Sequence, residues 1–164
     1  MCSKLRSVDA EFFDLEVYAM YKAAHELLGE RTWRMVWRSG EIVFEELEGR
    51  LNVRGDDVLV AIKKIADYLQ KVGYVKHIGV REVKEDEFEY EMKDSVIIRG
   101  TQRLIGEGAV PAHISTTVML AMLKKIFGLK ATLIGEPTFH EDGRAVERWR
   151  LTRITETPHE NSLS

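Results

Sequence analysis

The 164-residue sequence contains one cysteine, three prolines and no long apolar run. The single cysteine, Cys2, excludes an internal disulfide, so we expect a reducing, cytoplasmic compartment. No apolar segment approaches the roughly 20 residues that a membrane-spanning helix needs. The first residues, "MCSKLRSVDAEFF", lack the apolar centre of a signal peptide. We therefore expect a protein without membrane contact.

The balance of residue types is that of an ordinary globular domain, with 45% hydrophobic and 31% charged residues. The length allows one domain with a sizeable core but not two. We predict this domain over residues 1–154, followed by a flexible polar tail at residues 155–164. The net charge of −3 gives no general attraction to nucleic acid.

Apolar side chains recur with helical spacing in three segments of the N-terminal half. The first predicted helix begins after Asp9, whose carboxylate suits an N-cap, and ends at Gly29. The second follows Thr32, and the third follows a cap at Asp56 or Asp57. Three helices therefore precede the first strand.

The second predicted helix contains a glycine, Gly40, on its apolar face. Glycine destabilises a helix, so its position there indicates close approach of another backbone or of a ligand. A tight helix crossing is the favoured reading. The apolar face comprises Trp33, Val36, Trp37, Gly40, Val43, Phe44 and Leu47.

The second half of the chain alternates between strands and one apolar helix. Strands are predicted at residues 75–83 and 87–92, and "SVIIRG" is predicted to extend the sheet. A helix after Pro111 is apolar nearly all round, so it should be buried between layers. A last hairpin joins residues 129–136 to residues 145–154. The predicted class is α+β, with N-terminal helices packed on an antiparallel sheet and a buried helix between two hairpins.

The last strand places a glutamate on its buried face. Strand side chains alternate, so Glu147 shares a face with Trp149 and Leu151, while Arg148 and Arg150 face the other way. The arginines favour solvent, which directs Glu147 into the core. A lone ionised carboxylate there would be costly, so we expect a partner that neutralises it.

Several segments resemble the 4-vinyl reductase domain of small hydrocarbon-binding-type proteins. "GLKATLIGEPTF" and "DGRAVERWRL" stand where that family has its glutamate-bearing strand and its closing strand, and "TWRMVWRSGEIVFEEL" resembles its glycine-containing helix. The likeness covers residues 32–152 and is sharpest from His113 onward. It implies a fold shared with Golgi transport-particle subunits and haem nitric-oxide sensor domains, and a dimer-prone module that binds a small apolar ligand.

Zinc-binding members of that family use three cysteines and a glutamate as ligands. The corresponding positions here are His113, Glu136, Phe139 and Glu147. His140 is the residue directly after Phe139. Histidine nitrogens and carboxylate oxygens can form a tetrahedral zinc site, so His113, Glu136, His140 and Glu147 are the candidate ligands. The alternative is an ion pair of a glutamate with His113 or an arginine, without metal. No nucleotide or flavin motif is present, and we do not extend the resemblance to reductase activity.

Large aromatic and flexible side chains are the candidate lining of a ligand cavity, although they also suit a plain core. They are Trp33, Trp37, Phe44, Phe88, Tyr90, Met119, Met122 and Trp149.

The resemblance and the wide apolar stripe of the first helix predict a homodimer. Its interface would include Phe12, Phe13, Val17 and Met20.

Two other functions compete with ligand binding. Residues 41–75 could form a helix-turn-helix followed by a wing, as in a DNA-binding regulator. The proposed wing, "REVKEDEFEYE", is acidic and would repel phosphate. The third alternative is a metal-dependent enzyme in which Glu136, Glu147 and the histidines act as acid-base groups, but no spacing assigns a catalytic residue.

Overall fold

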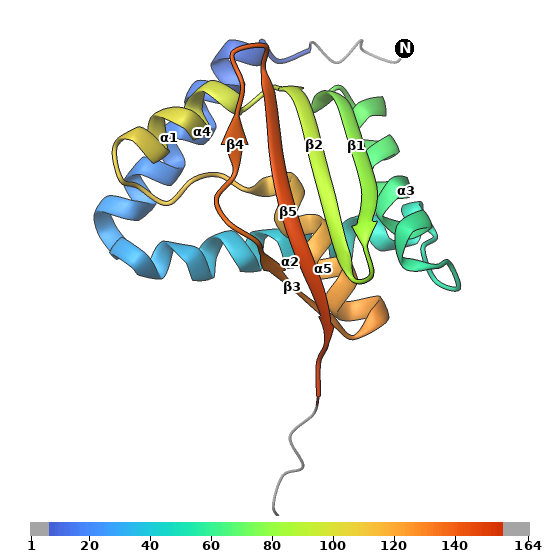
Figure 1. Ribbon diagram of the computed structural model, residues 1–164. Coiled ribbons are helices and arrows are strands. Elements are labelled where there is room, and N and C mark those ends of the chain that lie inside the picture. Colours follow the sequence, from blue (N-terminus) through green and yellow to red (C-terminus); the bar gives the residue numbers. More distant parts are fainter. Residues whose placement is uncertain (1–6, 156–164) are drawn as a thin grey trace, which may run out of the picture.

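The computed structural model describes residues 7–155, in which the helices gather on one side of a five-stranded antiparallel sheet (Figure 1). This confirms the α+β class. Cys2 and all but the first residue of the polar segment 155–164 lie outside the described residues. The elements are α1 (Ala10–Leu28), η1 (Gly29–Arg31), α2 (Thr32–Leu51), α3 (Val58–Lys71), β1 (Val75–Lys84), β2 (Glu87–Ser95), α4 (Ile98–Gly106), α5 (Ile114–Phe127), β3 (Leu129–Leu133), β4 (Thr138–Phe139) and β5 (Arg144–Arg153).

Aspartate caps begin two of the helices, as the sequence predicts. The Asp9 carboxylate accepts a hydrogen bond of 3.0 Å from the amide of Phe12, and Asp57 accepts one of 2.9 Å from Val60. Each bond satisfies an amide that has no partner within the helix. Asp57, rather than Asp56, is therefore the cap of α3.

The sheet has the order β1-β2-β5-β3, and β4 pairs with β5 as well. β3 lies along residues 149–153 of β5, whereas β4 lies along residues 145–146. The two short strands thus follow one another along the same edge of β5. Between them the chain passes through Pro137, which has no amide hydrogen to donate to a strand neighbour. β3 itself ends at Leu133, three residues before the predicted strand end at residue 136.

The segment after β2 corrects the prediction that "SVIIRG" extends the sheet. Asp94 has a φ of 52°, and the chain leaves the sheet after Ser95 and enters α4. Ile97, Thr101 and Leu104 are buried, and their separations of four and three residues are those of one helix face. Ile97 and Leu104 pack in a second hydrophobic cluster that includes Val17 of α1. Packing on α1 therefore outweighs the strand tendency of the apolar run.

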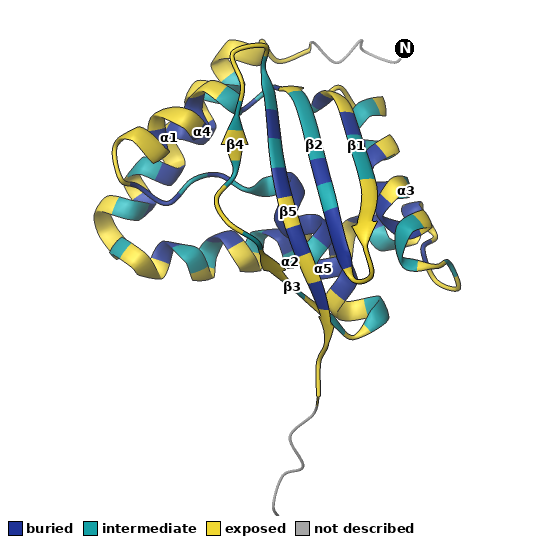
Figure 2. Cartoon of the chain, in the orientation of Figure 1, coloured by how far each residue is buried: buried dark blue, intermediate teal, exposed yellow. Residues whose placement is uncertain are grey.

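Helix α5 lies between the sheet and α2, as predicted for a helix apolar nearly all round. Met119 and Met122 are fully buried and share one cluster with Phe44 of α2 and with Tyr90 and Trp149 of the sheet. Figure 2 shows the matching alternation along β5, in which buried and exposed residues succeed one another. None of the helices within residues 7–155 has the length and apolar content of a membrane span.

The crossing of α2 and α5 explains the glycine in the apolar face of α2. A Cβ atom placed on Gly40 would lie 2.5 Å from the Cβ atom of Thr117. Such a distance is far inside van der Waals contact, so only glycine allows the two backbones to approach this closely. The predicted helix crossing is confirmed.

Replacing Gly40 with alanine is expected to lower the free energy of unfolding by about 1–3 kcal/mol, because the added methyl group forces α5 away from α2. Gly49, on the exposed side of the same helix, has no atom within 4 Å of an added Cβ. Gly49→Ala should therefore raise the free energy of unfolding by up to about 1 kcal/mol. Urea denaturation measures both free energies of unfolding. The same change in Gly40→Ala as in Gly49→Ala would contradict the tight crossing.

Candidate functional site

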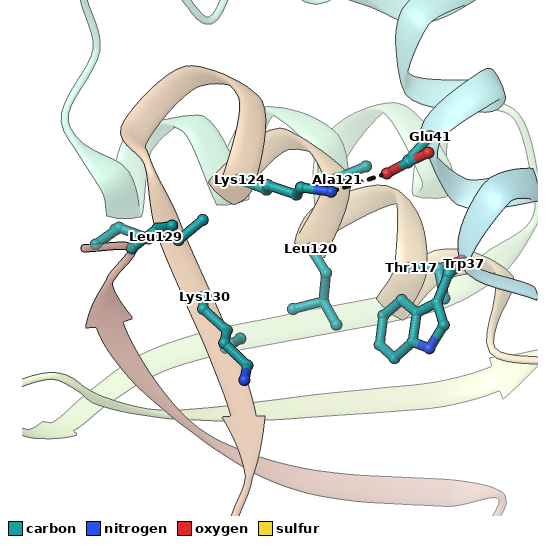
Figure 3. A pocket seen from close by; sticks show the side chains of 10 residues that line it. Trp37, Glu41, Thr117, Leu120, Ala121, Lys124, Leu129 and Lys130 are labelled. Carbon is teal, nitrogen blue, oxygen red and sulfur yellow. Dashed lines mark hydrogen bonds and ion pairs between the residues drawn. The ribbon is translucent and has the colours of Figure 1, made fainter. Parts of the chain in front are cut away.

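A groove with largely apolar walls runs between α2, α5 and the edge strand β3. It consists of an outer pocket of about 480 Å³ and an inner pocket of about 390 Å³. Figure 3 shows the outer pocket, with Trp37 on one side and Leu129 and Lys130 on the other. The two pockets share Trp37, Thr117, Leu120, Lys130 and Ala131. We therefore treat them as one groove.

Three aromatic rings form a row along the α2 side of the groove. Trp33 and Trp37 are one helical turn apart, and their ring centroids are 6.4 Å apart. On the inner side, the ring of His113 stacks on Trp33 at 5.8 Å with an angle of 18° between the planes. Trp37 is 45% exposed at the outer end of the row. The row therefore leads from solvent to the buried end of the groove.

An ion pair between α2 and α5 lies at the rim of the outer pocket. Lys124 of α5 donates a hydrogen bond of 3.2 Å to Glu41 of α2, the dashed contact in Figure 3. Arg38 donates a second one of 3.1 Å to the same carboxylate. Arg38 and Lys124 lower the pKa of Glu41, which keeps it ionised at neutral pH. The apolar groove thus has a charged rim beside α2.

The inner pocket ends at a buried carboxylate, as the strand alternation predicts. Glu147 is 5% exposed, and its Oε2 atom accepts hydrogen bonds of 3.2 Å from the Thr116 hydroxyl and 3.1 Å from the Trp149 indole. The Nδ1 atom of His113 lies 3.5 Å from Oε1 of the same carboxylate. The geometry therefore agrees with the alternative in which Glu147 pairs with His113.

The other two candidate zinc ligands do not join this pair. Glu136 and His140 are exposed. β4 pairs Phe139 with Ala145, and Phe139 borders a small cavity beside Glu147. Because strand neighbours alternate, His140 points to the opposite side. Within residues 7–155 no three His, Cys, Asp or Glu side chains are grouped to hold a metal ion. The structure therefore does not bring the four candidate ligands together, and zinc binding at these residues stays a prediction.

The eight aromatic and methionine residues predicted to line a cavity divide between groove and core. Trp33, Trp37 and Trp149 line the inner pocket. The other five lie in the main hydrophobic cluster and line neither pocket of the groove, because α5 and the sheet pack them together. They are Phe44, Phe88, Tyr90, Met119 and Met122.

The groove also contains residues that the sequence does not reveal as functional, among them Leu120, Lys130 and Ala131. Ala131 lies opposite Leu151 in the pairing of β3 with β5. Its small side chain leaves open space beside α5. The only local signal is an alanine in an apolar strand, which does not identify a pocket by itself.

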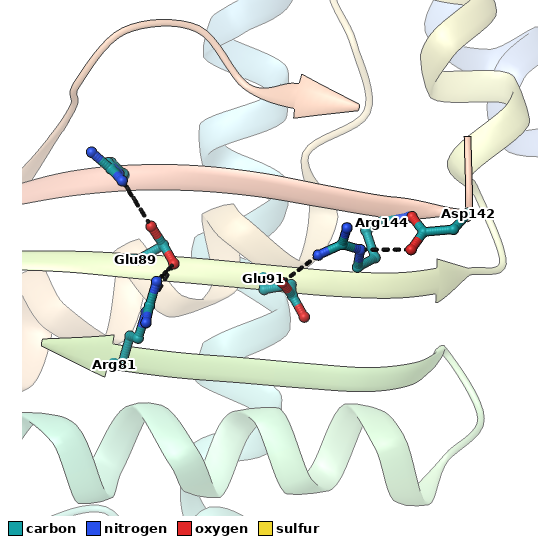
Figure 4. A network of polar contacts seen from close by, with 6 residues as sticks. Arg81, Glu89, Glu91, Asp142 and Arg144 are labelled. Carbon is teal, nitrogen blue, oxygen red and sulfur yellow. Dashed lines mark hydrogen bonds and ion pairs between the residues drawn. The ribbon is translucent and has the colours of Figure 1, made fainter. Parts of the chain in front are cut away.

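The opposite face of the sheet carries paired charges and borders no part of the groove (Figure 4). Glu89 accepts hydrogen bonds from Arg81 and from Arg148, and Arg144 contacts Glu91. Arg81 is the main cause of the lowered pKa of Glu89. The hairpin considered as a wing is thus part of the central sheet, and its one arginine, Arg81, is engaged by Glu89. This arrangement does not favour phosphate binding.

Comparison with solved structures shows what the fold resembles. The chain is similar to trafficking protein particle complex subunit 3 from Naegleria fowleri, a structure covalently bound to palmitic acid, with a TM-score of 0.57 and 9% identity over 90% of this chain and 98% of that one. It is also similar to a protein from a study of haem redox potential and porphyrin distortion, with a TM-score of 0.54 and 12% identity over 91% of this chain and 78% of that one.

Neither a protein-family model nor a curated protein sequence matches the chain. The relationship is therefore a distant one, visible in the fold. It agrees with the predicted kinship to Golgi transport-particle subunits and haem-binding domains.

Replacing Glu147 with alanine is expected to lower the free energy of unfolding by about 1–3 kcal/mol, because the Trp149 indole and the Thr116 hydroxyl lose their buried acceptor. Glu136→Ala, at an exposed position nearby, should change it by less than about 0.5 kcal/mol. Thermal and urea denaturation with added zinc and with a chelator should give the same loss. A loss of stability in Glu147→Ala that depends on zinc would support the metal hypothesis instead.

Proposed function

We propose that the protein binds a small, elongated and mainly apolar molecule in the groove between α2, α5 and β3. The observation that carries this proposal is the groove itself, whose two pockets of about 480 and 390 Å³ meet along five shared residues. Each pocket falls within the range of roughly 300–1,000 Å³ that is usual for small-molecule sites.

The exposed apolar surface of the groove supports the same proposal. Trp37, Leu133 and Ile154 line it and are each more than two-fifths exposed. Contiguous apolar surface in contact with water is unfavourable and marks interaction sites in many proteins. A bound apolar molecule would remove this surface from water, which is favourable in proportion to the area covered.

The fold relatives add independent support. One is described as bound to palmitic acid, and the other is described in terms of haem. The resemblance of the sequence to the 4-vinyl reductase domain of hydrocarbon-binding-type proteins points to the same class of ligand.

Filling the groove tests the proposal without removing any native contact. The uncharged fluorescent probe N-phenyl-1-naphthylamine should bind the wild-type protein saturably, with increased emission. Ala131→Phe places a ring where the two pockets meet, and we expect at least about tenfold weaker binding, equivalent to losing roughly 1.4 kcal/mol. Val83→Phe, at an exposed position on β1, is the control. Unchanged affinity in Ala131→Phe would place the probe elsewhere.

We also propose that two copies associate through the exposed side of α1. Phe12 and Met20 are exposed, as the predicted interface requires, and Leu15 and Leu27 are exposed on the same helix. The predicted interface is corrected at Val17, because this side chain is buried in the second hydrophobic cluster of the protomer and is not available to a partner. An apolar helix side of this kind suits a two-fold, self-complementary contact.

Sedimentation tests this association. At tens of micromolar, roughly the range of a modest protein–protein affinity, the wild-type protein should sediment as a dimer. Met20→Glu places a charge on the exposed side of α1 and should yield a monomer with an unchanged melting temperature. Val60→Glu, at an exposed apolar position on α3, should remain a dimer. A wild-type monomer at this concentration would contradict the proposal.

A further inference from the structure

We propose that the inner pocket selects apolar molecules that carry a protonated primary amine, which binds the Oε1 atom of Glu147. This inference rests on the proposed function and specifies its ligand class. An ammonium group supplies both a positive charge and hydrogen-bond donors, and the Oε1 atom can accept a hydrogen bond from it.

The two oxygens of Glu147 differ in what they contact. Oε2 accepts hydrogen bonds from the Thr116 hydroxyl and the Trp149 indole. Within residues 7–155, Oε1 accepts no hydrogen bond, and its nearest basic group is Nδ1 of His113 at 3.5 Å. Both neutral donors thus bind one oxygen, and the other retains lone pairs beside the inner pocket that Glu147 lines.

A carboxylate so placed has a strong preference for a donor. Glu147 is 5% exposed, so water solvates its charge poorly. Electrostatic interactions are stronger in such surroundings than in solvent, and a buried carboxylate with one oxygen that accepts no hydrogen bond is costly. A ligand that brings a positive charge to Oε1 offsets that cost, whereas a ligand carboxylate would meet like charge.

A row of three tryptophans fits the same head group. Trp33 and Trp37 line the pocket on the α2 side, and Trp149 lines it near the carboxylate. The electron-rich faces of tryptophan rings attract ammonium groups, and the effect is larger away from water. A cation passing from the outer pocket to Glu147 would travel along this row, while its hydrocarbon chain would remain between Leu120 and Ala131.

Two basic side chains border the inner pocket and oppose a cationic ligand. His113 lies against Glu147 and stacks on Trp33. Lys130 projects from the edge strand β3, where it is exposed and screened by solvent. The effect of Glu147 on a ligand charge is stronger than that of Lys130, because the Glu147 carboxylate lies in a poorly solvated space and the Lys130 ammonium does not. The buried carboxylate therefore decides the preference at the inner end.

The test uses three molecules with the same twelve-carbon chain: dodecylamine, dodecanol and dodecanoate. Each is titrated against the full-length protein with bound N-phenyl-1-naphthylamine, below its aggregation concentration and at constant ionic strength. We expect dodecylamine to displace the probe at about tenfold lower concentration than dodecanol. A hydrogen bond between charged groups is stronger than a neutral one, and the difference in free energy corresponds to roughly tenfold in affinity. Dodecanoate should be the weakest competitor.

Two matched variants assign the preference to one carboxylate. Glu147→Gln preserves the shape of the side chain and should bring dodecylamine to within about twofold of dodecanol, a difference too small for a charge-assisted bond. Glu136→Gln removes the same charge from an exposed position and should keep the wild-type order. The wild-type series needs no variant, so it decides the proposal even if Glu147→Gln does not fold.

The remaining outcomes separate this inference from the proposed function. If the three molecules displace the probe equally, or dodecanoate displaces it best, the groove binds apolar molecules but the amine preference is wrong. If Glu136→Gln abolishes the preference as Glu147→Gln does, general surface charge is the cause and the inference is overturned. If neither the probe nor any of the three molecules binds, both proposals fail.

Discussion

The close crossing of α2 and α5 at Gly40 and Thr117 is the contact on which the site depends. It brings the two helix backbones together at a point where any side chain larger than hydrogen would separate them. Trp37 projects from α2 close to this point, and Thr117 lines both pockets of the groove. One packing constraint therefore sets the distance between the aromatic row and α5, and with it the width of the groove.

The groove exists because the sheet ends early on the same side. Gly128 closes α5 in a left-handed conformation, with a φ of 62°, and the chain turns directly into β3. β3 has only five residues and pairs with β5 alone among the described strands. The apolar surface of α5 beyond this short edge strand is left partly uncovered. A longer or paired edge would bury Leu120 and Ala131 as ordinary core residues.

The parts of the structure that the sequence predicts are those set by local patterns. Caps at Asp9 and Asp57 and the alternation that directs Glu147 inward need only neighbouring residues. The helix at residues 98–106 was missed because an apolar run suits strand and helix equally until its packing partner is known. The groove was missed for a similar reason, since it depends on which residues of β5 face β3.

The separation of the candidate zinc ligands has the same origin on a smaller scale. The sequence places Glu136 and His140 near Glu147 in the last hairpin, but proximity along a hairpin does not determine direction. The break at Pro137 and the pairing of Phe139 with Ala145 set the alternation of the short strand β4. With Phe139 inward, His140 is outward, and among residues 7–155 the buried carboxylate has His113 alone as its basic neighbour.

The most direct test of the account is to locate a bound apolar molecule. A dodecyl chain bearing a terminal diazirine can be photocrosslinked to the protein and mapped by mass spectrometry of the peptides. We predict crosslinks on residues 32–51 of α2 and on residues 114–133 of α5 and β3, which line the groove. Crosslinks confined to α1 or to the charged outer face of the sheet would contradict a ligand site between α2, α5 and β3.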